Sequence, residues 1–173
     1  KIDSIGLVMD PDAKTTLAFV DNDETGDRSF SFYRKPGADM MLREDEVNYE
    51  LIDNCRIFHF GSLSMTDEPV RSATYAMVDY AKKKNKIISF DPNLRPPLWE
   101  SEELAAKQIW YGIEQCDILK IADNEIEWLT GTDVYDKGIE IIRERTHAKL
   151  INVTLGPNGS IAYYGDHKVF MEP

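Results

Sequence analysis

Four short apolar runs recur along the central and C-terminal parts of the chain, at residues 57–60, 87–90, 117–121 and 150–155. Between them, apolar residues recur at helical spacing; after Pro69, for example, they stand at positions 70, 73, 77, 80 and 81. Short, nearly all-apolar strands that alternate with amphipathic helices are typical of a parallel sheet that helices cover on both faces. The pattern therefore predicts an α/β fold, a mostly parallel sheet flanked by helices.

Capping residues indicate where the helices begin and end. Ser101, followed by two glutamates, suits the start of one helix, and Asp123 suits the start of another that ends at Gly131. Thr132 or Asp133 is expected to begin a further helix that runs to about residue 145, and residues 44–54 are expected to form a short acidic helix. The last alternating stretches, 160–164 and 168–171, predict a hairpin added to the sheet.

The N-terminal part of the chain has a different pattern. Residues 15–20 and 28–34 are rich in strand formers and flank an acidic, glycine-containing turn at 21–27, which predicts a β-ribbon. A ribbon of two strands is marginally stable alone and needs a surface to lie on. The predicted organisation is a lead-in segment (1–14), a ribbon (15–39) that acts as a lid, and an incomplete α/β core (40–173).

Composition narrows the range of partners. The 173 residues include 20 Lys and Arg against 31 Asp and Glu, a formal net charge of −11, which argues against nucleic acid or an anionic membrane as a general partner. No apolar run approaches the roughly 20 residues of a membrane-spanning helix. The two cysteines, Cys55 and Cys116, precede apolar runs and are expected to be small buried residues in a reducing, cytoplasmic compartment.

Candidate chemistry stands where the strands end, because ligands of open parallel sheets bind outside the carboxyl ends of the strands. The strand ends carry Gly61-Ser62, the segment 91–97 (DPNLRPP), Lys120 with Glu125, and the segment 154–159 (TLGPNG). A cation, carboxylates and a glycine turn on one rim suit a phosphate-bearing ligand and its metal. The sequence therefore predicts a phosphate site at this rim.

Simpler explanations remain open for each of these residues. Asp91 and Asn93 can make side-chain turns before prolines, and Glu125 can offset a helix dipole. Gly156 and Gly159 can form a tight turn, and His59 is expected to be a core residue within its strand.

Signatures of other enzyme classes are missing from the sequence. There is no GxxxxGK[ST] loop, GxGxxG fingerprint, GxSxG elbow or His/Cys cluster for zinc. A phosphatase-like hydrolase that uses Asp91 would need an aspartate two residues later, where Asn93 stands.

Four segments resemble one family when read in order. Residues 90–99 (FDPNLRPPLW) are similar to the DPNLRPxLW stretch of fructokinases, and residues 125–131 (EIEWLTG) to an ExxxLTG segment. Residues 153–159 (VTLGPNG) resemble a TLGxxG turn, and residues 30–39 a lid ribbon with its return to the core. The family is that of the ribokinase-like (PfkB) carbohydrate kinases, fructokinase type.

The resemblance implies a role for each matching residue. Tyr33 and Arg34 would lie over the sugar as part of the lid, and Asn93 and Arg95 would face the sugar and the phosphoryl groups. It also implies an ATP-dependent transfer to a primary hydroxyl of a ketohexose such as fructose.

The nucleotide side follows from the same resemblance. Glu125 would act through the water shell of a Mg²⁺ ion on the ATP phosphates, and Thr154, Gly156 and Gly159 would line the nucleotide. The resemblance also implies a homodimer formed through the lid ribbon.

The chain also departs from the family pattern. Ala122 stands where ribokinases carry an asparagine, which weakens the metal assignment of Glu125. The chain contains neither the sugar-binding GG motif nor the GAGD motif, which carries the general base and an anion hole. It is therefore expected to be an inactive central fragment of a sugar kinase. The alternatives are a non-catalytic nucleotide- or sugar-binding module and a kinase for 2-keto-3-deoxygluconate or a related sugar.

Overall fold

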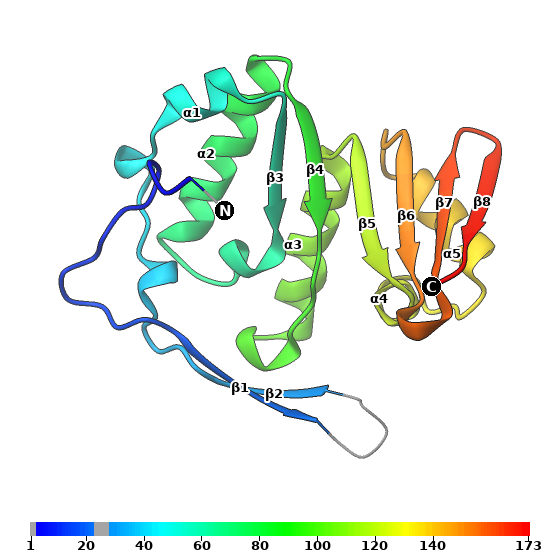
Figure 1. Ribbon diagram of the computed structural model, residues 1–173, viewed down its shortest axis with the longest axis horizontal. Helices are drawn as coiled ribbons and strands as arrows, with labels where there is room; N and C mark the ends of the chain where they lie inside the picture. Colours follow the sequence, from blue (N-terminus) through cyan, green and yellow to red (C-terminus); the bar gives the residue numbers. More distant parts are fainter. Residues whose placement is uncertain (1–2, 23–27) are drawn as a thin grey trace.

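A computed structural model describes residues 3–22 and 28–173 (Figure 1). Most of the predicted acidic turn, residues 23–27, lies outside the described residues. The strands are β1 (Leu17–Asn22), β2 (Arg28–Tyr33), β3 (Ile57–Gly61), β4 (Ile87–Asp91), β5 (Ile118–Ala122), β6 (Leu150–Thr154), β7 (Ser160–Tyr164) and β8 (His167–Met171). The helices are α1 (Tyr49–Asn54), α2 (Val70–Lys83), α3 (Glu102–Gln115), α4 (Asp123–Thr130) and α5 (Tyr135–Arg143).

The main sheet has the order β3-β4-β5-β6-β7-β8, the order of the sequence. Strands β3 to β6 are parallel, and β7 and β8 form the predicted antiparallel hairpin beside β6. Helices connect these four strands. The strands run in one direction, so their carboxyl ends lie together at one edge of the sheet, called the carboxyl edge below (Figure 1). The predicted α/β fold with a mostly parallel sheet is confirmed.

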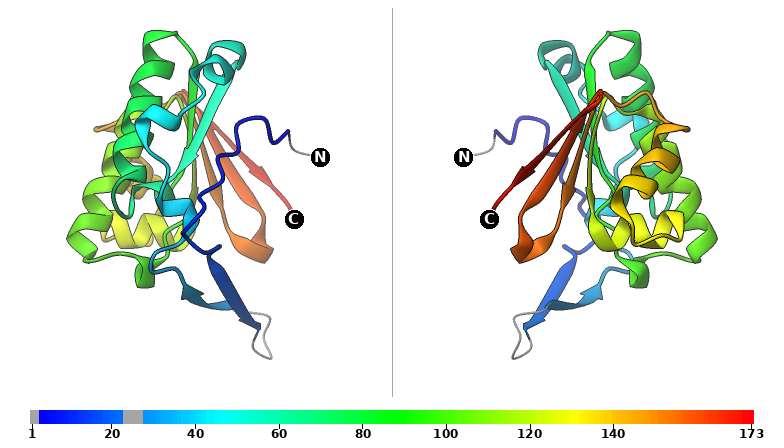
Figure 2. Two further views of the ribbon diagram at one scale, coloured as in Figure 1. Left: turned by 90° about the vertical axis from the view of Figure 1, so that its left-hand side faces the viewer. Right: turned by 90° about the vertical axis from the view of Figure 1, so that its right-hand side faces the viewer.

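Helices α2, α3, α4 and α5 lie on one face of the main sheet (Figure 2). Alternate strand residues point to that face and are buried, and Gly112 lets α3 approach closely, since a Cβ there would collide with the ring of Phe90. The buried strand residues are Phe60, Ile88, Phe90, Leu119, Ile121, Ile151, Val153, Ile161 and Tyr163. This face is the hydrophobic core.

The opposite face differs from the expectation that helices cover both faces. Among the described residues no helix lies over it (Figure 2), and burial along the strands alternates instead of being continuous. Ile57 and Ile87 are exposed there. His59 is exposed on this face too, so the prediction that it is a core residue is wrong.

The helix ends agree with the sequence in part. The Ser101 hydroxyl accepts a hydrogen bond from the Leu104 N–H (3.1 Å), and Gly131 ends α4 in a left-handed conformation (φ 71°). Asp123 is the first residue of α4 and not its cap, because the Glu125 carboxylate accepts the Ala122 N–H instead. The predicted helix at 44–54 is divided into a 3-10 turn at Glu44–Glu46 and α1.

Strands β1 and β2 form the predicted ribbon, which lies along the edge of the main sheet where the parallel strands end (Figure 1). Val20 pairs with Phe30 and Phe19 with Ser31, so side chains alternate between the two faces of the ribbon. Phe30 and Phe32 share one face, and Phe19 and Tyr33 share the other. No helix within residues 3–22 and 28–173 has the length and apolar character needed to cross a membrane.

Candidate functional site

The loop after β4 and the start of α4 are joined by one buried carboxylate. The Glu125 side chain, in a residue only 6% exposed, accepts hydrogen bonds from the Leu94 N–H (2.6 Å) and the Ala122 N–H (2.8 Å). Asn93 has a left-handed backbone (φ 46°), which asparagine tolerates better than most residues, and it turns the chain just before Leu94. The structure therefore brings Asn93, Arg95 and Glu125 together.

The loop after β6 lies beside this junction. Thr154, the last residue of β6, pairs with Ala122, the last residue of β5. Gly156 follows with φ 55°, and a Cβ there would meet no atom within 4 Å, so the backbone is open to a ligand. Gly159 (φ 95°) serves the protein itself, because a Cβ there would collide with the Met171 carbonyl oxygen.

Arg34 is buried and anchors the ribbon. Its Nε donates to Asp39 Oδ2 (2.8 Å), its Nη1 to Thr66 Oγ1 (2.8 Å) and its Nη2 to the Leu63 carbonyl oxygen (2.9 Å). Because the guanidinium binds these three partners, Arg34 holds the ribbon to the core. Its contact with a sugar stays a prediction.

The surroundings of Asp39, the acidic partner of Arg34, lower the pKa of its carboxyl. Burial by itself raises the pKa of the Asp39 carboxyl, but hydrogen bonds from Thr16 and Arg34, together with the charge of Arg34, outweigh it. The pKa of Asp39 therefore lies below its ordinary value, and the carboxylate stays charged next to the guanidinium at neutral pH.

A cavity of about 710 Å³ lies between the ribbon and the loop after β4. Its walls carry Tyr33 and Arg34 from the ribbon side and Pro97 and Leu98 from the predicted motif segment. Tyr33 is 69% exposed, so its ring has room to contact a ligand at the mouth of this cavity.

Arg95 has a partner that the sequence reasoning missed. Its guanidinium lies over the ring of Phe30, with Cζ 4.7 Å from the ring centroid, and its Nη1 donates to the Leu94 carbonyl oxygen (2.9 Å). Phe32 stacks beside Phe30, with centroids 6.1 Å apart. The alternation Phe30-Ser31-Phe32 was a usable signal, since it places two aromatic rings on one face of the ribbon.

Asp91 and Lys120 form an ion pair on the face opposite the helices, with 3.3 Å between Lys120 Nζ and each Asp91 carboxylate oxygen. The lysine neutralises the aspartate that a phosphatase-like mechanism would use as a nucleophile. Nearby, His59 Nδ1 and Ser89 Oγ are 3.1 Å apart.

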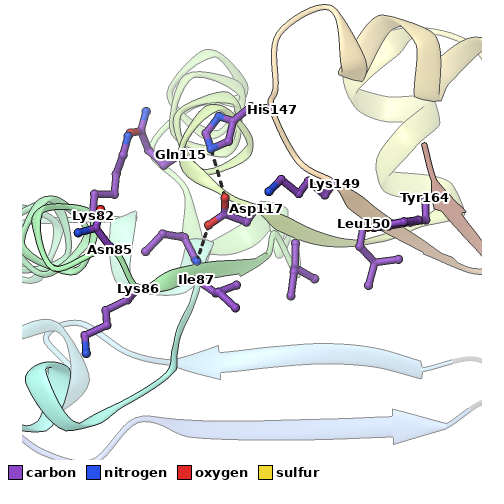
Figure 3. A pocket seen from close by; sticks show the side chains of 12 residues that line it. Lys82, Asn85, Lys86, Ile87, Gln115, Asp117, His147, Lys149, Leu150 and Tyr164 are labelled. Carbon is purple, nitrogen blue, oxygen red and sulfur yellow. Dashed lines mark hydrogen bonds and ion pairs between the residues drawn. The ribbon is translucent and has the colours of Figure 1, made fainter.

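A second cavity, of about 550 Å³, lies at the opposite edge of the sheet, where the parallel strands begin (Figure 3). Asp117 is central to it: its carboxylate accepts the Ile88 N–H (2.8 Å) and lies 3.7 Å from His147 Nε2. Two of the lysines that line it have protein partners for their ammonium groups: Lys82 donates to Gln115 Oε1 and Lys86 to the Asp53 carbonyl oxygen. These contacts give Asp117, Lys82 and Lys86 a structural role.

The described residues hold no group of three His, Cys, Asp or Glu side chains that could bind a metal ion by themselves. Both cysteines are free. Cys116 is buried as predicted, and burial raises the pKa of its thiol to about 12, while Cys55 is half-buried.

Comparisons with known proteins identify what the chain is similar to. A family model described as "pfkB family carbohydrate kinase" matches residues 1–173. The "Probable fructokinase-2" of Arabidopsis thaliana is 45% identical over 165 residues, which cover 95% of this chain and 50% of that protein.

Two solved structures share the fold. A fructokinase of Xylella fastidiosa with bound ATP has a TM-score of 0.82 and 32% identity, covering 96% of this chain and 53% of that one. A fructokinase of Vibrio cholerae in a form with bound fructose, ADP and calcium ion has a TM-score of 0.88 and 29% identity, covering 99% of this chain and 55% of that one. The chain thus spans about half the length of the relatives it matches.

Proposed function

The chain belongs to the pfkB family of carbohydrate kinases, and from this membership we propose that it is part of a fructokinase-type enzyme. The reaction is transfer of the γ-phosphoryl group of ATP to a primary hydroxyl of a ketohexose such as fructose. The observation that carries the proposal is the junction at the carboxyl edge, where Glu125 joins the Arg95 loop to the end of β5, next to Thr154.

The nucleotide side is proposed to lie over the loop after β6. The backbone at Gly156 is open, so a phosphate chain can approach its amides closely, with Thr154 alongside. Gly159 holds the turn in shape against β8. Arg95 supplies a guanidinium that can bind phosphate oxygens in a bidentate manner and offset the charge of the transferring group.

The sugar side is proposed to be the cavity beneath the ribbon. Tyr33 and Arg34 line it, and Asn93 lies in the loop that connects it to the phosphate side. Since the ribbon roofs this cavity, it can exclude water from the reacting hydroxyl, which favours transfer to the sugar over hydrolysis.

The residues present fit an indirect contact with Mg²⁺. Mg²⁺ at nucleotide sites is usually held by substrate phosphates, waters and one or two carboxylates, and it neutralises phosphate charge there. Both Glu125 oxygens already accept a backbone N–H, so the contact of this carboxylate with the ion would run through water.

Calorimetric titration with ATP tests the proposed nucleotide site. Gly156→Ala should weaken ATP binding about tenfold, because the added Cβ occupies the space that the phosphate chain needs. Gly165→Ala is the matched control: Gly165 has the same φ of 55° and open surroundings but lies between β7 and β8. Equal effects of the two substitutions would contradict the proposed site.

A coupled kinase assay tests the expectation that these 173 residues are inactive alone. The sequence contains no GAGD motif, so no general base is assigned to the sugar hydroxyl. The chain is expected to give no turnover above background with ATP and either fructose or 2-keto-3-deoxygluconate. Appreciable turnover would overturn the expectation, and its preferred sugar would identify the substrate.

We also propose a homodimer through the ribbon face that carries Leu17 and Phe19, opposite Phe30 and Phe32, in a cytoplasmic protein. Leu17 and Phe19 are exposed on that face and give it an apolar surface. Phe19→Lys should shift a dimer to a monomer in sedimentation velocity. A monomeric wild-type chain would contradict the proposal.

A further inference from the structure

The Arg95 side chain lies between the ribbon and the carboxyl edge of the sheet, where the phosphate site is proposed. Its guanidinium rests on the face of the Phe30 ring (4.7 Å to the centroid), and its Nη1 donates to the Leu94 carbonyl oxygen (2.9 Å). A guanidinium that stacks by its face keeps its edge for hydrogen bonds in its own plane. The contact with Phe30 therefore fixes the plane of the cation and leaves donors available to an anion.

Both ends of this contact are supported. Phe30 stacks against Phe32, with an interplanar angle of 9°, and the ribbon beyond them is held to the core through Arg34. On the core side, the backbone next to Arg95 is held by the bond from the Leu94 N–H to Glu125 Oε1 (2.6 Å). Glu125 thus fixes the base of the arginine, and Phe30 fixes its tip.

We propose that Phe30 is a positioning residue that orients the Arg95 guanidinium toward a phosphate chain. The ligand class, the polyphosphate of a nucleoside triphosphate, rests on the proposed function. Without the ring, the guanidinium would lose its aromatic support and regain rotamer freedom, which costs binding free energy when an anion binds.

Arginine side-chain NMR on the full 173-residue chain tests the contact without any ligand. Protons above an aromatic ring are shifted upfield, so the Arg95 Nε–Hε signal should be ring-shifted in the wild type. Phe30→Leu should abolish the shift and Phe30→Tyr should keep it. Phe19→Leu, on the opposite face of the same ribbon, should leave it unchanged. A signal that Phe30→Leu does not move would overturn the proposal.

ATP titration calorimetry then tests positioning by a double-mutant cycle. Phe30→Leu should weaken ATP binding about three- to tenfold, and Phe30→Tyr by less than about twofold, because a cation–π contact needs an aromatic ring and not only apolar volume. In an Arg95→Gln background, Phe30→Leu should have no further effect.

Two outcomes separate this proposal from the proposed function. A loss of affinity that persists in the Arg95→Gln background would overturn the positioning role, since Phe30 would then act independently of the arginine. A wild-type chain that does not bind ATP would contradict the proposed nucleotide site, and the ligand-free NMR result would then decide the Phe30–Arg95 contact by itself.

Discussion

The two edges of the main sheet are both closed by a carboxylate, yet only one has the features of a ligand site. At the carboxyl edge, Glu125 accepts the N–H groups of Leu94 and Ala122. At the amino edge, the Asp117 side chain accepts the Ile88 N–H, and its carbonyl oxygen accepts the Lys149 N–H. Both residues join neighbouring strands. A well hydrogen-bonded carboxylate can therefore stabilise the fold, and it does not by itself indicate a ligand site.

The two edges differ in the partners of their cationic side chains and in how accessible the backbone is. At the amino edge, Lys82 and Lys86 have protein partners for their ammonium groups. At the carboxyl edge, Arg95 stacks by its face and Gly156 presents an open backbone in a left-handed conformation. A guanidinium held by its face beside an open glycine backbone, rather than the number of charged residues, distinguishes the candidate site.

Removing each carboxylate is the largest test of this comparison. Glu125→Ala leaves two backbone N–H groups without their acceptor and should lower the free energy of unfolding by about 3 kcal/mol. Asp117→Ala, at a partly exposed position, should cost about 1 kcal/mol. Urea denaturation measures both, with Glu127→Ala, exposed on the same helix as Glu125, as a control expected to be neutral.

Equal losses for Glu125→Ala and Glu127→Ala would show that the junction is not the framework element that the contacts indicate. In that case the convergence of the loops after β4 and β5 would need another cause.

The two glycines of the loop after β6 are expected to differ in their effect on stability. Gly159→Ala should destabilise the fold by about 2 kcal/mol, since it adds a collision with the Met171 carbonyl to an unfavourable φ. Gly156→Ala should cost about 1 kcal/mol, the strain of the left-handed conformation alone. Thermal unfolding of both variants checks the order, and a larger loss for Gly156→Ala would reverse our assignment of the two glycines.

The anchor of the ribbon should show a local effect. Arg34→Leu removes the bonds to Thr66 and the Leu63 carbonyl, so backbone amides of β1 and β2 should exchange about tenfold faster, while those of α3 stay protected. The control is Arg43→Leu, because Arg43 is an exposed arginine outside the ribbon. Hydrogen-exchange mass spectrometry measures both, and an unchanged ribbon would contradict the anchor.

A smaller effect is expected from pH. Because the folded pKa of Asp39 lies below its ordinary value of about 3.9, its contribution to stability is complete above that value and is lost as pH falls through the lowered pKa. Ribbon amides should therefore lose protection in acid, at a pH where the core is still folded. In Asp39→Asn this pH dependence should vanish; a variant that keeps it would place the titrating group elsewhere.

The sequence predicted the sheet and the motif loops well because both depend on local signals. Apolar runs defined the strands, and the ends of parallel strands meet at one edge, so Arg95, Glu125 and Gly156 could be expected to lie near one another. The exposed face of the sheet was missed although the strands carry a signal for it. A polar residue stands at the alternate position of each parallel strand, and these residues share one face: His59, Ser89, Lys120 and Asn152.

Side-chain partners were less accessible to sequence reasoning. The Arg34 guanidinium binds Thr66 and the Leu63 carbonyl, contacts between residues about thirty positions apart that no local pattern indicates. The contact between the Arg95 guanidinium and the Phe30 ring depends on how the ribbon lies on the core, which no local pattern determines.

Amide chemical shifts during an ATP titration test most directly whether the carboxyl edge is the nucleotide site. We expect the amides of Arg95, Ala122 and Gly156 to shift together and saturate at one ATP concentration, while those of Asp117 and Lys149 stay in place. Shifts centred on Asp117 and Lys149, with the three carboxyl-edge amides unmoved, would contradict it.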